Sequence, residues 1–507
     1  MGSWFRIWGG IGFLASRLLG QGAATASGPA ESAVTDLAGL RNALTASLAA
    51  TRAPGSTWGV QVVSMDSGRV WFETNSTRLF VPASNTKLFT VAMALDRFGT
   101  NHVWETRLLA SGRPNSDGVL PGDLWVDGGG DPAPGEGLLD PKALVKFREA
   151  LEKAGVRSIQ GGIVVRDEWF RATPYGPGWN WDDLQEGYGA PVGGLVFGDN
   201  TCRLVVIGAA TAGGEPVVRT APFDGVFEIR STVRTVPTNR VAGVRVLRLP
   251  GSRVLEVSGE VGVGRTHGER LAVPDGAEWF GRGLRAALVS GGIRVGGQVN
   301  RSREDPPAVL LGTVPSASMG ELAALCLKPS NNLIAHQLWL QVGADVRRRP
   351  RAGERVEAGD DSDAAARAMG RFAAGFGVGP ESLVIEEGSG LSRKNLMTPA
   401  ATVRLLRHMA GHPAGRTYLE AMPVGGVDGT LWSRFTRGPL KGVVRAKTGT
   451  LRHVNALAGH LTTAGGSRLG FAIYVNGYQS ADAGASGRGE MDRLVELLGR
   501  YAGAGPE

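Results

Sequence analysis

A serine and a lysine stand three residues apart where the sequence predicts the beginning of a helix. After Pro82, which favours an extended residue before it, Ser84 opens a run whose apolar residues have helical spacing: Leu88, Val91, Ala92 and Leu95. Residues three apart lie on one side of a helix, so the Lys87 amine can reach the Ser84 hydroxyl. A serine becomes an effective nucleophile when a base takes its proton, and a lysine kept neutral by burial or a second cation is such a base. Taken alone, the pair also fits a helix-capping serine beside a lysine in solvent.

Two further segments combine a serine or a lysine with a distinctive backbone context. Lys328-Pro329-Ser330 separates predicted helices over 321–327 and 331–342, so we expect Ser330 on a turn or at a helix N-cap. Lys447-Thr448-Gly449 lies in a predicted strand over 443–451, where Gly449 allows a substrate backbone to approach and add to the sheet edge.

The three segments form a known combination. In chain order, Ser84-x-x-Lys87, Ser330-Asn331-Asn332 and Lys447-Thr448-Gly449 match the signature of penicillin-binding proteins and serine β-lactamases, with Asn331 in place of its central aspartate. Each segment is a weak match by itself. Together, each in its proper structural context, they are a specific one.

The elements that must position these motifs come from both ends of the chain. The periodicity predicts a helix over 35–51, a hairpin over 58–65 and 69–73, and the Ser84 helix to about residue 98. The C-terminal part is predicted to contain helices and strands over 364–376, 398–410, 443–451, 455–462, 469–478 and 491–501. This order predicts a mixed α/β (α+β) fold whose sheet is completed from both chain ends.

The residues between the first and second motifs differ in character. They are rich in glycine and short β-like runs, such as 162–166 and 254–263, with helical pieces over 141–154 and 279–290. We therefore expect a β-rich insertion over 105–309, as two small domains, between two parts of a catalytic domain over 33–104 and 310–507. Because none of the three motifs lies in it, the insertion is predicted to be structural or substrate-guiding.

With these motifs, the chain resembles the low-molecular-mass class C penicillin-binding proteins, which are D-alanyl-D-alanine carboxypeptidases and endopeptidases. The resemblance extends from about residue 35 to 500 and includes four further motifs: Gly122-Asp123-Leu124 with Gly128-Gly129-Gly130-Asp131-Pro132, Gly178-Trp179 with Asp182-Asp183, Gly388-Ser389-Gly390-Leu391-Ser392-Arg393, and Gly426-Val427-Asp428-Gly429-Thr430-Leu431. Glu387 stands where the family has an aspartate, which keeps the charge. The resemblance implies a serine β-lactamase/D,D-peptidase-like fold, with an antiparallel sheet flanked by helices and a large insertion.

The same resemblance implies roles for the catalytic residues. Ser84 is the acylated nucleophile, Lys87 its general base, and Ser330 relays a proton to the leaving amine. The backbone N–H groups of Ser84 and Thr450 form the oxyanion hole. A second cation at Lys447 would disfavour the charged form of Lys87, as a general base requires.

Further residues are expected to bind the substrate. By resemblance, Asn332 holds the substrate amide, and Gly449 lies in the strand that the substrate approaches. The groups expected to hold the terminal carboxylate are Lys447, Thr448 and Thr450. Arg393 is expected at the rim of the cleft, close to the side chain of the peptide's third residue, although a surface arginine in a loop fits equally well.

The implied activity is that of a penicillin-sensitive serine D,D-carboxypeptidase/endopeptidase, acting on peptidoglycan through an acyl-enzyme on Ser84. Its expected partners are stem peptides and β-lactams, and no cofactor or metal is required. Two alternatives stay open: a β-lactamase-like hydrolase, against which the insertion argues, and a non-catalytic wall-binding protein, whose hallmark would be a lost motif residue. The sequence leaves the preference between carboxypeptidase and endopeptidase activity open.

Composition argues against several other classes of protein. The chain has 55 basic and 47 acidic residues, a net charge of +8, and its dense basic run over 347–351 precedes an acidic stretch over 360–363. This pattern favours a solvated loop over a nucleic-acid patch. Two cysteines, Cys202 and Cys326, are too few for a disulfide framework or a four-cysteine zinc site.

The first 28 residues resemble an export signal, with Arg6, an apolar stretch over 7–15 and the small-residue site Ala24-Thr25-Ala26. No later stretch approaches the length of a membrane span. We therefore expect an exported, periplasmic or otherwise extracytoplasmic protein with at most peripheral membrane association.

Two other motifs are interpreted as structural. The glycines of 128–132 lack the lysine of a phosphate-binding loop, so they predict a turn. His408 and His412 lack the glutamate of the zinc-protease motif, because Met409 follows the first histidine, and are expected at the surface near a helix end.

Overall fold

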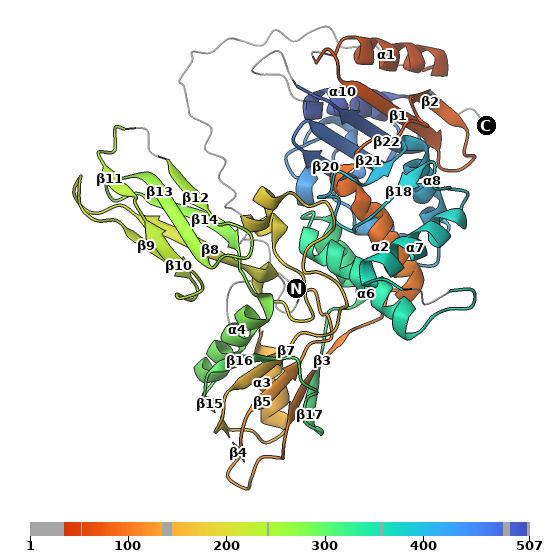
Figure 1. The fold of residues 1–507 in the computed structure, drawn as a ribbon. Helices are drawn as coiled ribbons and strands as arrows, with labels where there is room; N and C mark the ends of the chain where they lie inside the picture. The colour runs from red at the N-terminus through yellow and green to blue at the C-terminus, as the bar shows by residue number, and fades with distance from the viewer. Residues whose placement is uncertain are drawn as a thin grey trace. The chain divides into compact units, whose positions relative to one another are not determined.

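A five-stranded sheet combines strands from residues 57–74 with strands from residues 445–476 (Figure 1). Its order is β2-β1-β22-β21-β20, and every neighbouring pair is antiparallel. The strands are β1 (Thr57–Ser64), β2 (Val70–Thr74), β20 (Arg445–Leu451), β21 (Val454–Thr462) and β22 (Arg468–Asn476). Strand β1 pairs with β22 along its whole length, which confirms the prediction of a sheet completed from both chain ends.

The computed structural model describes residues 35–51, 53–133, 144–240, 243–354, 358–479 and 487–503. The predicted export signal over 1–28 lies outside these residues. Within the described part, no helix is both long and apolar enough to cross a membrane.

Alternation along the strands gives the sheet two buried faces. On β22, Phe471, Ile473 and Val475 pack with helices α1 (Leu37–Ala49) and α10 (Gly487–Arg500), which lie side by side over one face (Figure 1). Ala472 and Tyr474 point to the opposite face and join a larger core. A strand alternates its side chains between faces, so one β22 sequence serves both cores.

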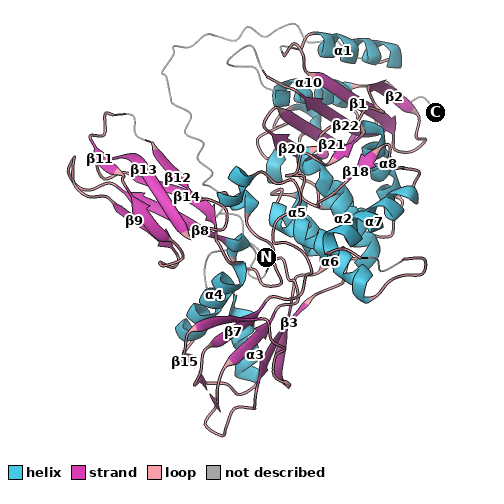
Figure 2. Ribbon diagram, in the orientation of Figure 1, coloured by secondary structure: helices cyan, strands magenta, loops and turns pink. Residues whose placement is uncertain are grey.

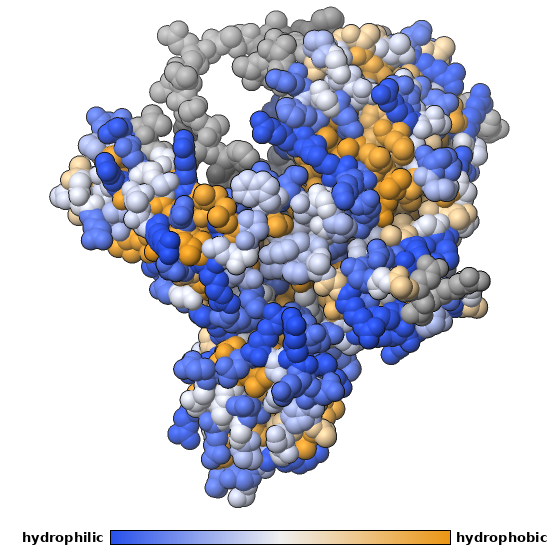
Figure 3. Space-filling view, in the orientation of Figure 1, coloured by the Kyte–Doolittle hydropathy of each residue, from blue (hydrophilic) through white to orange (hydrophobic). Residues whose placement is uncertain are grey.

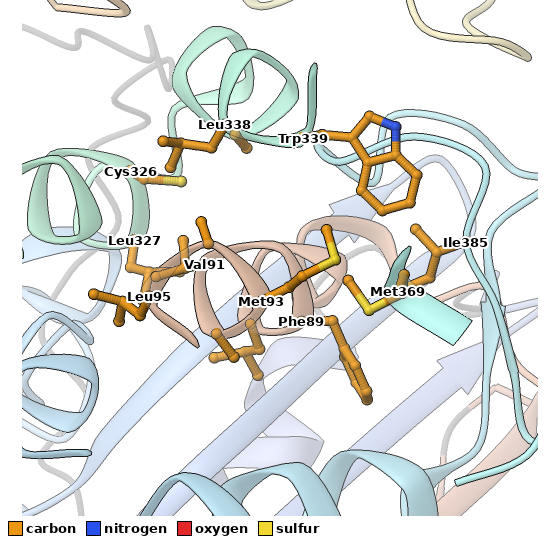
Figure 4. Packing of buried hydrophobic residues seen from close by; sticks show 14 of the residues in the cluster. Phe89, Val91, Met93, Leu95, Cys326, Leu327, Leu338, Trp339, Met369 and Ile385 are labelled. Atoms are coloured by element: carbon orange, nitrogen blue, oxygen red, sulfur yellow. The ribbon is translucent and has the colours of Figure 1, made fainter. Parts of the chain in front are cut away.

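The larger core lies among helices on the second face (Figure 2). These helices are α2 (Thr86–Phe98), α5 (Met319–Leu327), α6 (Asn332–Arg348), α7 (Asp361–Ala374), α8 (Pro399–Ala410) and α9 (Gly415–Glu420). Helix α2 is at its centre, and residues 86–95 are all buried. Figure 4 shows Val91 and Leu95 of α2 among apolar side chains of the neighbouring helices. Because α2 is covered on every side, its position is fixed by packing, and so is the turn that precedes it.

A short hairpin beside these helices carries the motif over 388–393. Strands β18 (Leu383–Val384) and β19 (Leu396–Met397) pair antiparallel, and the loop over 385–395 connects them. Phe80, just before the Ser84 turn, forms a β-bridge with Met397. This bridge anchors the hairpin next to the entrance of α2.

The region between β3 and β17 has a core of its own. One five-stranded sheet has the order β16-β7-β5-β3-β17, with β3 (Glu105–Ala110), β5 (Leu124–Asp127), β7 (Ile163–Arg166), β16 (Val299–Ser302) and β17 (Val309–Pro315). Helices α3 (Val145–Lys153) and α4 (Gly276–Ser290) pack with it, and a small sheet joins β4 (Val119–Leu120), β6 (Ser158–Ile159) and β15 (Arg294–Val295). Residues 141–143 of the predicted helix over 141–154 lie outside the described residues.

Two further sheets in this region are formed by the chain between β7 and α4. One joins β8 (Thr201–Ile207), β9 (Val217–Ala221) and β14 (Thr266–Ala272), and the other β10 (Glu228–Ser231), β11 (Arg234–Val236), β12 (Val244–Leu247) and β13 (Val254–Gly262). The chain between β7 and β8, over 167–200, has only short 3-10 turns. This connecting segment contacts the catalytic motifs, as described below.

The basic run over 347–351 is the predicted solvated loop only at residues 349–351, which are exposed. Helix α6 continues through Arg348, and Arg347 pairs at 2.8 Å with Asp361, whose side chain is buried. The Arg348 guanidinium lies 3.6 Å from the centre of the Trp169 ring. The acidic stretch is therefore a partner of the basic run.

On the face shown in Figure 3, hydrophilic residues are spread among hydrophobic ones rather than gathered in one stripe.

The two histidines at i, i+4 spacing lie at the end of α8, as predicted, and both are partly exposed. His408 stacks on Phe376 with ring centres 4.7 Å apart, and His412 lies 3.4 Å from Asp96. Burial, followed by the neighbouring His412, lowers the pKa of His408.

Candidate active site

Ser84 lies in a 3-10 turn immediately before α2. The turn spans Ala83–Asn85, so the α-helix begins at Thr86, two residues later than the sequence predicts. Ala83 has a φ of +48°, in the left-handed region that non-glycine residues seldom adopt. The Thr86 hydroxyl donates to the Ala83 carbonyl at 3.0 Å and supports this conformation. Lys87 still follows one turn after Ser84, and its Nζ lies 2.9 Å from Ser84 Oγ.

The Lys87 side chain is completely buried and has three acceptors. Besides Ser84 Oγ, Nζ contacts Asn332 Oδ1 at 2.6 Å and the Ser389 carbonyl at 2.5 Å. Burial lowers the pKa of Lys87 to about 8, against the opposing effects of Cys326 and Glu387. A lysine with this pKa has an appreciable neutral fraction near neutral pH, which is what a general base needs.

Ser330 and Lys447 form a second serine–lysine pair. Ser330 has a φ of +65° in the break between α5 and α6, and Lys447 Nζ lies 2.7 Å from its Oγ. Lys447 is buried on β20 and also donates to the Thr448 carbonyl at 2.8 Å. Burial, followed by the nearby charge of Lys87, lowers the pKa of Lys447 well below its usual range. We expected the charge of Lys447 to lower the pKa of Lys87. Burial, the other cause named from the sequence, lowers the pKa of Lys87, and the repulsion between the two ammonium groups lowers the pKa of Lys447.

The amides of Asn331 and Asn332 link the second motif to the connecting segment over 167–200. Asn332 accepts from Lys87 and donates through Nδ2 to the Tyr188 carbonyl at 2.9 Å. Asn331 Oδ1 caps α6 by accepting from the Ile334 N–H at 3.0 Å, and its Nδ2 donates to Asp199 at 3.2 Å. The predicted substrate-binding residue Asn332 therefore lies beside the predicted base.

Strand β20 brings the third motif against the Ser84 turn. A Cβ on Gly449 would lie 2.7 Å from the Pro82 carbonyl oxygen, so only glycine fits there without a shift. The Thr448 hydroxyl donates to Thr430 at 2.8 Å, and Thr450 is exposed beside Arg488. Thr430 belongs to the quoted 426–431 motif, which had no assigned role.

Arg393 occupies a more peripheral position. Its side chain is exposed, and Nη2 donates to the carbonyl of Arg452 at 2.8 Å, just beyond the end of β20. The structure therefore brings Ser84, Lys87, Asn332 and Ser389 together, and Ser330 with Lys447. Arg393 lies at the end of the strand that carries Thr448 and Thr450.

Glu387 is a buried residue whose contacts sequence reasoning missed. It is fully buried in the loop over 385–395, and Trp179 Nε1 of the connecting segment donates to it at 3.1 Å. Trp179 belongs to the Gly178-Trp179 motif, and Glu387 directly precedes the motif over 388–393. These family motifs were the sequence signal that could have pointed to the two residues. Among the described residues, no cluster of three or more histidine, cysteine or acidic residues could hold a metal ion.

The chemistry available to this arrangement is acyl transfer. A serine at the start of a buried helix faces a lysine of lowered pKa, and a second serine–lysine pair and a sheet strand lie in the two other motifs. In the described part of the site, the candidate nucleophile, base and proton donors are all side chains of this chain.

Comparisons with known proteins agree with this chemistry. The model of the D-Ala-D-Ala carboxypeptidase 3 (S13) family matches residues 40–498. The chain is 29% identical over 465 residues to a D-alanyl-D-alanine carboxypeptidase of Actinomadura sp. (strain R39), covering 89% of this chain and 82% of that protein. It is 26% identical over 432 residues to D-alanyl-D-alanine carboxypeptidase DacB of Haemophilus influenzae, covering 84% and 87%.

A solved structure shows the same fold. Penicillin binding protein 4 (dacB) from Haemophilus influenzae matches with a TM-score of 0.73 and 24% identity, over 92% of this chain and 100% of that one. This likeness confirms the predicted fold class, and the family match confirms the predicted resemblance. The chain belongs to the D-Ala-D-Ala carboxypeptidase 3 (S13) family of peptidases.

Proposed function

We propose that this protein is a serine D,D-carboxypeptidase/endopeptidase that cleaves D-alanyl peptide bonds of peptidoglycan through an acyl-enzyme on Ser84. The observation that carries the proposal is the contact of 2.9 Å between Ser84 Oγ and a buried Lys87 whose pKa is about 8. The family membership, and the relatives described as D-alanyl-D-alanine carboxypeptidases, support the same reaction class.

In the first half of the reaction, neutral Lys87 takes the proton of Ser84 Oγ as the oxygen attacks the carbonyl carbon of the scissile bond. The backbone N–H groups of Ser84 and Thr450 stabilise the oxyanion. As the C–N bond breaks, Ser330, hydrogen-bonded to Lys447, relays a proton to the leaving amine and regains one from the ammonium group of Lys87, so Lys87 is neutral again in the acyl-enzyme. This step leaves an ester on Ser84 and frees the amine product.

In the second half, water replaces the amine. Lys87 accepts a proton from the water, hydroxide adds to the ester carbonyl, and the C–O bond to Ser84 breaks with return of a proton to Oγ. The free D-alanine of a stem peptide and the amine of a cross-link are equivalent leaving groups in this scheme. The donor peptide therefore forms and leaves the same acyl-enzyme in the carboxypeptidase and the endopeptidase reaction.

Substrate binding is proposed to use the strand and the loop around Ser84. Lys447, Thr448 and Thr450 hold the terminal carboxylate, and the second N–H of the Asn332 amide remains for the substrate carbonyl, since one is used by Tyr188. Gly449 keeps strand β20 close to the Ser84 turn. Arg393 is proposed to bind a carboxylate on the third residue of the peptide.

β-lactams are proposed to acylate the same serine. The Haemophilus influenzae relative has been solved in complex with a β-lactam, and its fold matches this chain with a TM-score of 0.68. A β-lactamase would release the acyl group quickly, whereas a peptidase of this kind retains it. The activity on peptidoglycan implies work outside the cytoplasm, in keeping with the predicted export signal.

The test combines labelling with digestion. A fluorescent penicillin should label the wild-type protein on Ser84, located by mass spectrometry of the adduct, and Ser84→Ala should abolish both the label and D-alanine release from a defined pentapeptide. A cross-linked dimer assayed in parallel gives the preference between carboxypeptidase and endopeptidase activity. An adduct on Ser330, or D-alanine release by Ser84→Ala, would overturn the assignment.

A further inference from the structure

The loop over 385–395 folds around one buried carboxylate. Oε2 of Glu387 accepts from the backbone N–H and the hydroxyl of Ser389, at 2.8 and 2.6 Å. Oε1 accepts from the Gly390 N–H at 2.6 Å and from Asn395 Nδ2 at 2.9 Å. A carboxylate is an acceptor only, so a side chain surrounded by donors in this way is ionised.

This loop reaches the candidate base. The Ser389 carbonyl lies 2.5 Å from Lys87 Nζ, and the neighbouring Gly388 carbonyl accepts from the Thr90 hydroxyl at 2.7 Å. Gly390 has a φ of +81° and packs so closely that a Cβ there would overlap the Ala83 carbonyl oxygen. The loop therefore contacts both the turn that carries Ser84 and the lysine that activates it.

Trp179 holds the same carboxylate from the connecting segment. Its Nε1 donates to Glu387 Oε2 at 3.1 Å. A Cβ on Gly176 would lie 2.5 Å from that nitrogen, so the indole is tightly enclosed. The connecting segment also supplies the Tyr188 carbonyl to Asn332 and the Asp199 carboxylate to Asn331, so it supports the site at three points.

We propose that Glu387 is a positioning residue, whose carboxylate shapes the loop so that the Ser389 carbonyl holds Lys87 Nζ, and that Trp179 fixes this carboxylate from the connecting segment. The inference rests on the proposed function and extends it. It assigns a catalytic consequence to a residue that touches neither substrate nor reacting atoms, and to a segment outside the three motifs.

The charge of Glu387 also acts on Lys87. The titratable groups that face Lys87 are Cys326 on α5, Lys447 on β20 and Glu387, and Glu387 raises the pKa of Lys87 against the effect of burial. His336 of α6 lies 3.8 Å from the carboxylate, but its Nδ1 accepts from the Gly388 N–H at 3.3 Å and is therefore unprotonated. Glu387 is thus the charged carboxylate of this group.

The test follows the pH dependence of Ser84 acylation by penicillin. Glu387→Gln keeps the size of the side chain but removes its charge, so the acid limb should move down by roughly one pH unit. The amide N–H2 group would face the donors that the carboxylate binds, so the Ser389 carbonyl should be displaced and the rate above that limb should fall about tenfold. Glu386→Gln is the matched control, since its carboxylate is adjacent in sequence but pairs with the exposed Lys394. That control should keep the wild-type profile.

A purely structural role would lower the unfolding temperature without moving the acid limb, and that result overturns the proposal. So does an equal shift in Glu386→Gln. If Glu387→Gln does not fold, Trp179→Phe decides. That variant keeps an aromatic ring but removes the N–H donor and part of the indole, so it should slow acylation severalfold without weakening the initial binding of penicillin, and a wild-type rate overturns the proposal.

Failure of the proposed function is separable from failure of this inference. If the wild-type protein is not acylated, the proposed function fails. In that case the titration of Lys87, followed through the ¹³Cε resonance of labelled lysine, still has to shift downward in Glu387→Gln and not in Glu386→Gln. An unshifted titration in Glu387→Gln overturns the inference independently.

Discussion

Asn331 donates a hydrogen bond to Asp199 at 3.2 Å, and this contact joins the start of α6 to the connecting segment. The same side chain caps α6 through its oxygen, so both ends of the amide are used. An aspartate at this position caps a helix equally well but has no donor for Asp199. The asparagine that replaces the motif's central aspartate at position 331 is therefore complementary to the carboxylate of Asp199.

Asn331→Asp should destabilise the protein. It replaces a donor with a second carboxylate beside Asp199, at a cost of about 1–3 kcal/mol in the free energy of unfolding. Urea denaturation of Asn331→Asp, Asp199→Asn and the double variant measures the coupling. The double variant restores a donor and an acceptor in reversed order and should recover much of the loss, whereas strictly additive losses would show that the contact contributes nothing.

Lys87→Arg should fold but acylate at least about a hundredfold more slowly with penicillin, because arginine stays charged and cannot take the Ser84 proton. Stopped-flow labelling gives the rate. Lys441→Arg, an exposed lysine outside the site, is the control and should match the wild type. Near-wild-type acylation by Lys87→Arg would rule out Lys87 as the general base.

The rate of acylation should rise with pH and level off above the pKa of Lys87, which burial lowers to about 8. The reactive form is the neutral amine of Lys87, so the rate of acylation increases as this amine loses its proton. Folding stability should follow the same group. Between about 8 and its ordinary value of 10.5, Lys87 binds fewer protons in the folded than in the unfolded state, so stability increases as pH rises through this window. A rate that is flat or falls from pH 6 to 9 contradicts the assignment.

Gly390→Ala should damage both stability and acylation, because a Cβ there would overlap the Ala83 carbonyl of the Ser84 turn. Gly442 is a matched control, since its φ of +75° resembles the +81° of Gly390 but nothing lies within 4 Å of a Cβ. Both variants have the conformational cost of a positive φ. Gly390→Ala should lose about 1–3 kcal/mol more in thermal or urea unfolding. Equal losses would mean that the loop yields without strain.

Local periodicity predicted the elements that form the sheet, and the three motifs predicted which side chains would approach one another. Contacts outside these three motifs were beyond reach. Trp179 and Glu387 are 208 positions apart, and neither has a periodic pattern that points to the other. The start of α2 was misplaced because the left-handed Ala83 depends on packing against Gly390. The solvated loop predicted at 347–351 holds only for residues 349–351, because α6 continues through Arg348 and Arg347 pairs with Asp361 at the start of α7.

Arg393→Ala tests whether this exposed arginine reads the peptide. A guanidinium holds a carboxylate through two parallel hydrogen bonds, so a stem peptide with a free carboxylate on its third residue should lose about tenfold or more in kcat/KM. Acylation by a simple penicillin lacking that group should change little. Arg452→Ala is the control, since it removes a neighbouring exposed charge but keeps the backbone carbonyl that binds Arg393 at 2.8 Å. If Arg393→Ala weakens both ligands equally, its bond to that carbonyl supports the end of β20 instead, and no loss for either ligand would leave Arg393 without a role in recognition.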